Sequence, residues 1–444
     1  MSDCAPISPA PERGLGDEAA GERVEFAALQ LRTMRVLVTA QLLGALGLAA
    51  GGTAGSLLGA QITGSEAEAG LPLAVLVLGS GVGAVAVTRI MERRGRRTGL
   101  AAAHFSGALG AGLVVTAAAL WSWPLLLLGC GLLGGGNAAV MLARYAAADL
   151  SSRRGRSISA VVTAASIGAV AGPNLLGVAG SLARILGLPE PAGLFLLAMP
   201  AFAGAALVLL VFLRPDPLQV ARAVSAAPTP TGGGLAVLLG DSHIRFALLV
   251  LGVANLGMVG MMAVGPVHLH LHGAGLGLVG LVISVHIAAM FLPSPLTGWL
   301  SDAFGGRVVA MSGALLLVGA GGVAAVAGSD LPGSVAALLL LGVGWNAGLI
   351  GGSTLLRDAQ VDPALRTRAE GLGELGMGAA AAVGGSGAGL LLAAGGFGLV
   401  GLVAAAPCLL LLAVLVASRH RGLISPSVGT RIYEATAAQP AGSK

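Results

Sequence analysis

Charged residues are scarce in this chain, and this scarcity excludes a water-soluble globular domain. Only 10% of the 444 residues are Asp, Glu, Lys or Arg, whereas 55% are hydrophobic, and the mean hydropathy is +0.89. Lysine occurs once, at Lys444, so the net charge of +5 rests on arginine and does not indicate a nucleic-acid surface. The composition predicts an all-α polytopic protein that lies in a lipid bilayer.

Cysteines and nucleotide-binding motifs are also few or absent. Cys4 lies in a polar segment, and Cys130 and Cys408 lie in apolar runs, which excludes a disulfide framework and a cysteine metal site. The chain has no G-x-x-x-x-G-K-[ST] motif, so it does not drive transport by ATP. It also has no nucleophile and base at a workable spacing, which disfavours a membrane enzyme such as a lipid-modifying transferase. We expect no cofactor and no resident metal.

Hydropathy predicts twelve membrane spans. A spanning helix needs about 20 mostly apolar residues, and such runs occur at 37–60, 71–91, 99–120, 124–147, 157–181, 192–213, 245–267, 276–300, 308–328, 333–356, 368–394 and 397–417. The remaining segments predict a disordered tail at 1–34, a linker at 214–243 and a second tail at 418–444. The spans then divide into two halves, residues 35–213 and 244–417.

The arginines predict the orientation. Clusters such as 93–97, 153–156 and 366–368 follow even-numbered spans, whereas of the 25 basic residues only Arg184 falls in a connection after an odd-numbered span. Because basic residues stay on the cytoplasmic side, both tails and the linker are expected in the cytoplasm of a cell whose inner (plasma) membrane holds the protein.

The two halves repeat at an offset of 210 residues. Arg35 matches Arg245 and Gly47 matches Gly257, and after a one-residue slip Asn137 matches Asn346. The further matched pairs are Glu92 with Asp302, Gly95 with Gly305, Arg97 with Arg307, and Asp149 with Asp358. Six spans per repeat and the same side inside indicate parallel repeats, an arrangement of rocker-type transporters.

The loop after span eight carries a family signature. It runs from Gly298 through Asp302 and Gly305 to Arg307 and resembles the G-x-L-x-D-x-x-G-x-R loop of the major facilitator superfamily. The copy after span two departs from that pattern at Thr88 and Glu92. The resemblance implies twelve helices in two parallel six-helix repeats and alternating access. It also implies a gating motif made of Glu92, Arg93, Gly95, Arg97, Gly298, Asp302, Gly305 and Arg307.

A second motif lies in span five. Gly168, Gly172, Pro173 and Gly177 resemble the G-x-x-x-G-P-x-x-G-G motif of the superfamily's bacterial drug/proton antiporters, with Leu176 in place of one glycine. Small residues and a proline kink also serve simple helix packing, so this alternative stays open.

The resemblance also directs attention to the spans that line the central cavity in this superfamily, namely one, four, seven and ten. Each carries one amide, and these amides either hydrogen bond to neighbouring helices or contact the substrate. Methionines and a tryptophan on the same spans could offer an adaptable surface to apolar ligands. The candidate cavity residues are Gln41, Asn137, Met141, Asn255, Met261, Trp345 and Asn346.

Few charges lie at membrane depth. Arg144 either extends to the surface, or binds an anion or pairs internally, and Asp149 and Asp358 are expected to tie loop motifs to helix ends. Glu370 and Glu374, one helical turn apart, are expected to pair with the arginines 93–97 of the other half when the cytosolic side is shut.

The histidines are weaker candidates. His286, near the middle of span eight, is a candidate proton carrier, and His104 is expected to be structural. Between spans seven and eight, His268, His270 and His272 alternate with apolar residues. An exposed loop is the default expectation there, and a transition-metal site is the alternative.

These features predict a monomeric secondary transporter that carries a small-molecule substrate, with amphipathic or drug-like compounds exported in exchange for protons as the first expectation. Uptake of a metabolite or a metal ion is the alternative within transport. The sequence leaves the substrate and the coupling ion open.

Overall fold

The computed structural model describes residues 13–48, 53–64, 71–224, 235–274, 276–327, 330–359 and 363–420, and within these ranges the regular structure is entirely helical. The first eight helices are α1 (Arg13–Leu48), α2 (Thr53–Thr63), α3 (Leu71–Arg94), α4 (Arg96–Leu120), α5 (Trp123–Ala148), α6 (Arg154–Asn174), α7 (Leu176–Ile185) and α8 (Ala192–Phe212). The others are α9 (Pro217–Val224), α10 (Leu235–Gly240), α11 (Ser242–Leu271), α12 (Leu276–Phe291), α13 (Ser294–Phe304), α14 (Gly306–Ala327), α15 (Leu331–Asp358) and α16 (Pro363–His420).

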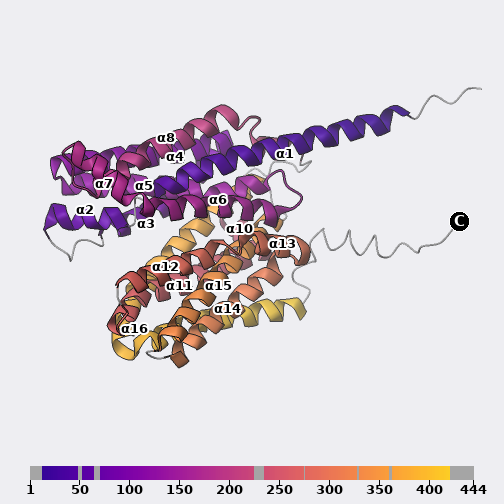
Figure 1. The fold of residues 1–444 in the computed structure, drawn as a ribbon. Helices are drawn as coiled ribbons and strands as arrows, with labels where there is room; N and C mark the ends of the chain where they lie inside the picture. Colours follow the sequence, from indigo (N-terminus) through magenta and orange to yellow (C-terminus); the bar gives the residue numbers. More distant parts are fainter. Residues whose placement is uncertain are drawn as a thin grey trace, which may run out of the picture.

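The helices form two bundles that lie side by side. Helices α1 to α8 gather in one bundle and α11 to α16 in the other (Figure 1). Two helix pairs give the main contacts between the bundles, α3 with α16 and α6 with α13. The turns after α3 and α13 lie at the bundle end where α1 begins and α16 ends, and we call this end the terminal face.

Nine helices in the described ranges are long and apolar enough to cross a membrane. They cover ten of the twelve predicted spans, because α16 combines spans eleven and twelve and only spans one and five have no segment among the nine. Gly395 and Gly396 leave the helical conformation at the place where α16 turns back. Span one falls on α1 and α2, with residues 49–52 outside the described ranges, and span five is divided between α6 and α7. Span eight turns between α12 and α13 and counts as one segment, Leu281–Phe304.

The N-terminal tail differs from the expectation. We expected disorder over 1–34, but α1 begins at Arg13. Alanine, leucine, arginine and glutamate are frequent from this point, and all four favour helix. Within the linker, α9 and α10 are helical as well.

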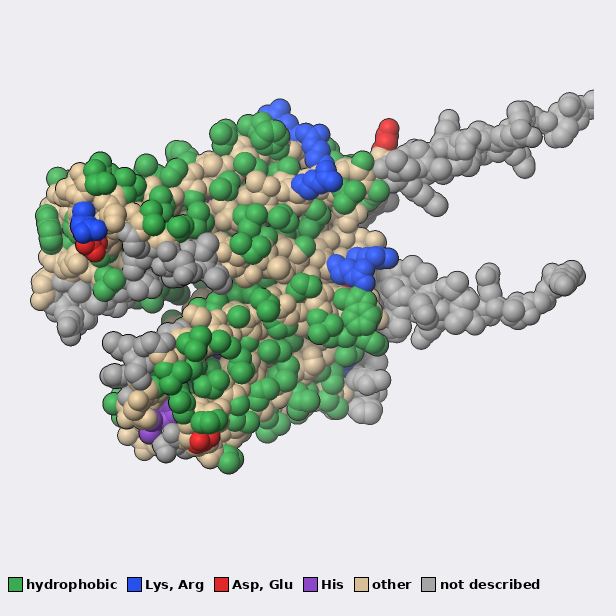
Figure 2. Space-filling view, in the orientation of Figure 1, with side chains coloured by type: hydrophobic (Ala, Val, Ile, Leu, Met, Phe, Trp, Pro, Cys, Tyr) green, Lys and Arg blue, Asp and Glu red, His purple; other side chains and the backbone are tan. Residues whose placement is uncertain are grey.

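The surface is that of a membrane protein. Hydrophobic side chains cover the flanks of both bundles, and the charged side chains visible in this view gather at the two ends (Figure 2). Large side chains such as Leu78 and Val82 on α3 are 65% and 69% exposed. A surface of this kind is stable against lipid tails and unstable against water.

Candidate functional site

Four buried charges form a closed ring between the two bundles at the terminal face. Arg96 pairs with Asp149 at 2.8 Å and with Glu370 at 2.5 Å, and Arg357 pairs with Asp149 at 2.6 Å and with Glu370 at 3.0 Å. The four side chains are at most 3% exposed. We call these residues the charge ring. It joins α4 and the end of α5 in the first half to α15 and α16 in the second.

The charge ring is neutral as a whole, which explains how four charges tolerate burial. Each charge touches two opposite charges, and charge-assisted hydrogen bonds offset the loss of water. Burial alone would raise the pKa of Asp149, but Arg96 and Arg357 lower that pKa below its ordinary value. Asp149 therefore stays ionised near neutral pH. The expected contact of Glu370 with the arginine cluster is made by Arg96.

A second ion pair crosses between the halves deeper in the protein. Arg144 on α5 donates to Glu374 on α16 at 2.6 Å and to Ser353 on α15 at 3.0 Å. Its guanidinium also donates to the Tyr145 hydroxyl. Arg144 is only 1% exposed, so in this conformation it pairs internally and does not extend to the surface. The expected pairing of Glu374 with the arginines 93–97 is wrong, because Glu374 lies one turn deeper than Glu370.

Asp302 binds the start of a helix in the opposite half. Its two carboxylate oxygens accept from the backbone N–H groups of Gly155, at 2.7 Å, and Arg156, at 3.0 Å. These groups lie in the first turn of α6, where unpaired N–H groups favour an anion. Gly298 permits the contact, because a Cβ there would lie 2.3 Å from Ser159 Oγ.

The other copy of the motif makes the equivalent contact between α3 and α16. Glu92 pairs with Arg368, at 2.8 Å, near the start of α16. Thr88 stands where the pattern has glycine, and it faces Gly371 of α16. A Cβ added at Gly371 would lie 2.5 Å from Thr88 Oγ1. The glycine needed for close approach is therefore supplied by the partner helix.

The motif glycines and arginines have separate roles. Gly95 and Gly305 have φ of 88° and 86°, a conformation that favours glycine, and each separates two helices at a sharp turn. Arg307 donates to the carbonyl of Leu415 and so stays within its own half. Arg93 and Arg97, expected in the gate, make no ion pair within the part of the chain that the structure describes.

Sequence reasoning missed two charged residues. One is Arg357, which completes the charge ring. Its position beside Asp358, at the end of span ten, could have indicated it from the sequence. Asp358 itself pairs with Arg154 across the halves at 2.8 Å. Asp216, in the linker, accepts from the backbone N–H groups of Arg96 and Arg97, at 3.1 and 2.8 Å, and so holds the start of α4.

The span-five motif coincides with the break in that span. α6 ends at Asn174 and α7 begins at Leu176. Gly168 lets α6 approach α1, since a Cβ would lie 2.7 Å from the backbone nitrogen of Leu46. The surroundings of Gly172, Pro173 and Gly177 lie outside the described side chains.

A small central pocket lies between the halves. Its volume is about 10 Å³, enough for one water-sized sphere. It is lined from both halves by Gln41, Val140, Met141, Arg144, Val162, Ala165, Phe291, Trp345 and Leu349. Gln41 Nε2 donates to the Val140 carbonyl at 2.9 Å, while Gln41 Oε1 is buried without a hydrogen-bond partner in the described residues. Three of the seven expected cavity residues, Gln41, Met141 and Trp345, therefore meet here.

The other expected cavity residues pack between helices. Asn137 donates to Ser80 Oγ at 2.9 Å. Asn255 donates to the Met377 carbonyl at 2.7 Å and accepts from Trp345 Nε1 at 3.1 Å. Met261 is buried in the apolar core of the second half. Of the two interpretations that the amides allowed, these contacts favour helix-to-helix bonds.

Asn346 is the most fully bonded of these amides. Its Nδ2 donates to the Met290 carbonyl and to Ser294 Oγ, both at 2.7 Å, and its Oδ1 accepts from Thr297 Oγ1 at 2.7 Å. It is 0% exposed and holds the broken segment between α12 and α13 against α15.

We expect Asn346→Ala to lower stability more than it changes ligand binding. The change removes the partner of the buried Met290 carbonyl and of Ser294 Oγ, and each such group costs about 1–3 kcal/mol. Thr297 Oγ1 keeps other acceptors. Thermal unfolding in detergent measures the effect, with Asn255→Ala beside the central pocket for comparison. An unchanged melting temperature would contradict this role.

The histidines lie away from the central pocket. His286 is 0% exposed, its Nδ1 lies 2.7 Å from the Leu338 carbonyl in the same half, and its Nε2 has no partner in the described residues. The exposed loop expected around His268 is wrong, because α11 continues to Leu271 and His268 is 4% exposed.

His268 and His272 share one helix face. Their ring centroids are 4.3 Å apart, and His268 lies 3.1 Å from Ser334 Oγ. The described residues contain no group of three metal-binding side chains. The His270 side chain lies outside the described side chains.

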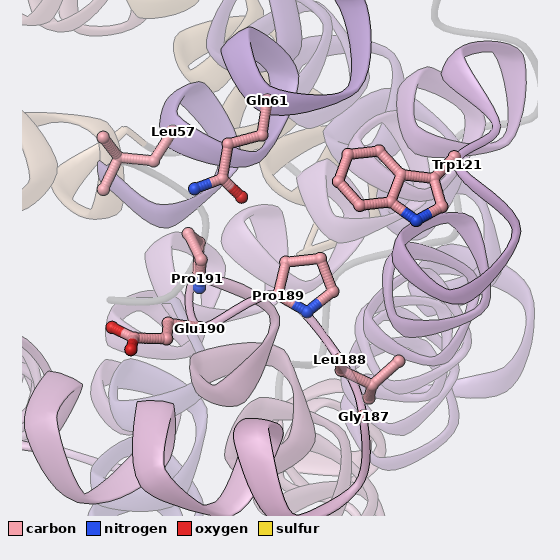
Figure 3. Close-up of a pocket in the computed structure, with 8 residues that line it drawn as sticks. All are labelled: Leu57, Gln61, Trp121, Gly187, Leu188, Pro189, Glu190 and Pro191. Carbon is pink, nitrogen blue, oxygen red and sulfur yellow. The ribbon is translucent and has the colours of Figure 1, made fainter.

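A larger cavity of about 780 Å³ lies in the first half, away from the residues described above. It is lined by Leu57 and Gln61 of α2, Trp121 at the α4 to α5 turn, and the connection before α8 (Figure 3). Only residues of the first half line this cavity, so it is not part of the contact between the halves.

The Asp302 contact predicts a measurable opening of the terminal face. Asp302→Ala removes both acceptors from α6, a loss of about 1–2 kcal/mol for a helix start, or about 5- to 30-fold in the ratio of closed to open forms. Spin labels on Ser152→Cys and Val308→Cys, one on each half, measure the distance between the halves. An unchanged distance distribution would contradict the prediction.

Comparison with known proteins agrees with this arrangement. The sequence model described as Major Facilitator Superfamily matches residues 37–358. The MFS-type transporter YddS of Bacillus subtilis (strain 168), described as uncharacterized, is 39% identical over 397 residues, 87% of this chain and 91% of the relative. The riboflavin transporter RfnT of Brucella anthropi is 30% identical over 360 residues, 77% of this chain and 84% of the relative.

Solved structures resemble the fold at low identity. The human organic anion transporter MFSD10 aligns with a TM-score of 0.68 and 17% identity, over 87% of this chain and 99% of that one. The Escherichia coli fucose:proton symporter FucP aligns with a TM-score of 0.62 and 16% identity, over 88% and 98%.

Proposed function

Because the chain belongs to the Major Facilitator Superfamily and the relatives named above are transporters, we propose that it exports small amphipathic compounds in exchange for protons by alternating access. The observation that carries this proposal is the pair of ionic contacts between the halves. The charge ring closes the terminal face, and the pair of Arg144 with Glu374 lies beside a central pocket lined from both sides.

Alternating access follows from where these contacts lie. Both would have to separate before the central pocket could connect to the terminal face. At the opposite face, no ion pair joins the two halves among the residues that the structure describes. The pseudo-symmetric contacts of Asp302 and Glu92 bring the halves together on the same face. Export is supported by the span-five motif and by the break in the helix at that motif.

We further propose that the terminal face is cytoplasmic, that the protein is a monomer of the plasma membrane, and that the halves are residues 35–213 and 244–417 with 214–243 as linker. Cysteine labelling by an impermeant reagent tests the orientation in intact cells. Glu190→Cys, at the opposite face, should react, and Arg94→Cys, at the terminal face, should not.

A second candidate is uptake of a planar aromatic metabolite. One relative is a riboflavin transporter, and the central pocket has Trp345 beside Phe291, with ring centroids 5.9 Å apart in an edge arrangement. Aromatic walls of this kind suit a planar ligand.

Transport by purified protein in liposomes decides between the two. The liposomes carry an imposed pH gradient, and the assay uses riboflavin beside a panel of dyes and drugs. Proton-driven movement of several dyes supports export of amphipathic compounds, and selective movement of riboflavin supports the second candidate. Movement of neither rejects both.

A further inference from the structure

Arg144 differs from every other buried charge in the described part of the chain, because it lines the central pocket. It pairs with one carboxylate, that of Glu374, whereas each arginine of the charge ring pairs with two. Glu374 is 8% exposed and comes from the opposite half. Removing or neutralising Glu374 would therefore leave one positive charge uncompensated at the wall of the pocket.

We propose that Arg144 is the binding site for the anionic group of an aromatic organic anion, which takes the place of Glu374 while Glu374 takes up a proton. This inference rests on the proposed transport function and adds the class of ligand to it.

The other residues that line the pocket have the chemistry that such a ligand needs. Trp345, Phe291 and Met141 offer aromatic and thioether surface to an apolar ring system. Gln41 Oε1 is buried and has no hydrogen-bond partner among the described residues, so it can accept a hydrogen bond from a donor on the ligand. The lining thus contains one group for an anion, Arg144, and one for a hydrogen-bond donor, Gln41.

The charge balance requires the proton. A second anion beside Arg144 with Glu374 still ionised would leave a net negative charge in a buried site, which costs several kcal/mol. Protonated Glu374 restores neutrality, with the anion and Arg144 as the new pair. The proton passes from a hydronium ion or a buffer acid in bulk solvent to a carboxylate oxygen of Glu374, so one O–H bond forms as the donor's bond to that proton breaks.

The neighbours of Glu374 allow this exchange. The charged and titratable groups nearest to it are Arg144 and Tyr145 on α5 and Glu370 one turn away on α16. Glu370 stays tied to Arg96 and Arg357 in the charge ring. From α11, Leu248 and Leu251 face the same turn of α16, and from α3 the charged Glu92 is tied to Arg368.

The small size of the central pocket connects the replacement of Glu374 by the anion with separation of the two halves. The central pocket holds about 10 Å³ in this conformation, so an aromatic anion enters only if side chains move apart. Release of Glu374 from Arg144 removes one contact between α5 and α16, and therefore between the halves.

Calorimetry on the purified full chain in detergent tests the site without transport. The probes are three aromatic acids, 2-naphthoate, 6-hydroxy-2-naphthoate and biphenyl-4-carboxylate, each with its neutral amide. We expect at least one acid to bind at pH 6 at least about tenfold more tightly than its amide. Titrations in two buffers of different ionisation enthalpy should show uptake of about one proton per bound acid. Equal binding of every acid and amide, or no binding of any, overturns the proposal.

Two variants locate the anion and the proton. Glu374→Gln should bind the acid equally at pH 6 and pH 8, without proton uptake, and continued uptake would overturn the role of Glu374. The double variant Arg144→Gln with Glu374→Gln replaces the ion pair by a neutral hydrogen-bonded pair. It should lose the preference for the acid over its amide, and a retained preference would overturn the role of Arg144.

The same binding data separate this proposal from the transport proposal. Binding of the acid with proton uptake but no flux in liposomes would reject transport and leave the site. Proton-driven flux of dyes without any preference for acids would reject the site and leave transport.

Discussion

Replacing Glu370 with alanine is expected to open the terminal face. The change leaves Arg96 and Arg357 buried with one carboxylate, Asp149, between them. Breaking a buried ionic contact by removing one partner costs about 3–5 kcal/mol, which corresponds to a shift of more than about 100-fold in the ratio of closed to open forms. Spin labels on Ser152→Cys and Val308→Cys should show the longer distance as the main population.

The matched control is the same substitution in an exposed pair. Glu190 pairs with Arg184 at 3.3 Å, but both side chains are 64% exposed, and such pairs contribute about 0–1 kcal/mol. Glu190→Ala should leave the distance unchanged. A closed population in Glu370→Ala equal to that of Glu190→Ala would show that the charge ring does not hold the halves.

A charge exchange of Arg96 with Glu370 is not expected to restore closure. A glutamate at position 96 would face Asp149, and an arginine at position 370 would face Arg357. Arg96→Gln combined with Glu370→Gln keeps the ring neutral and should recover part of the closed population.

Replacing Gly298 with valine is the second change with a large expected effect. A Cβ at this position would lie 2.3 Å from Ser159 Oγ and 2.7 Å from the Gly155 carbonyl oxygen. The backbone oxygen cannot rotate away, so α13 and α6 would have to separate. Overpacking of this kind costs about 1–3 kcal/mol, and the closed form should fall about 5- to 150-fold by the same spin-label distance.

Gly319→Val on α14 is the control for Gly298→Val, because a Cβ at Gly319 meets nothing within 4 Å. It introduces the same helix-disfavouring side chain without a clash. If both variants keep the closed distance, the contact between α6 and α13 is not needed for closure.

The sequence by itself determined the membrane character, the places where most helices begin and end, and the repeat. These properties depend on hydropathy and on turn residues, which act locally. The glycines after α3 and α13 are an example, since Gly95 and Gly305 were expected to turn the chain and both adopt positive φ. The return between spans eleven and twelve was also placed at residues 395–396, where the helix breaks.

The central pocket was predicted in part. Gln41, Met141 and Trp345 were expected in the cavity because they lie on the spans that line it in this superfamily, and all three line the pocket. Asn346 was on the same list but is turned away, because amides on one helix can face the pocket or a neighbouring helix. Which side an amide faces depends on how its helix is rotated about its own axis. On a glycine-rich helix that is apolar on all sides, the sequence does not show this rotation.

Only the tertiary structure decided how the charges pair. Glu370 and Glu374 are one turn apart in sequence, yet one joins Arg96 and Arg357 in the charge ring and the other joins Arg144. A partner more than 200 residues away is fixed by the depth and rotation at which two helices meet. Sequence shows that a buried charge needs a partner, because burial without one is costly, and only packing shows which partner is within reach.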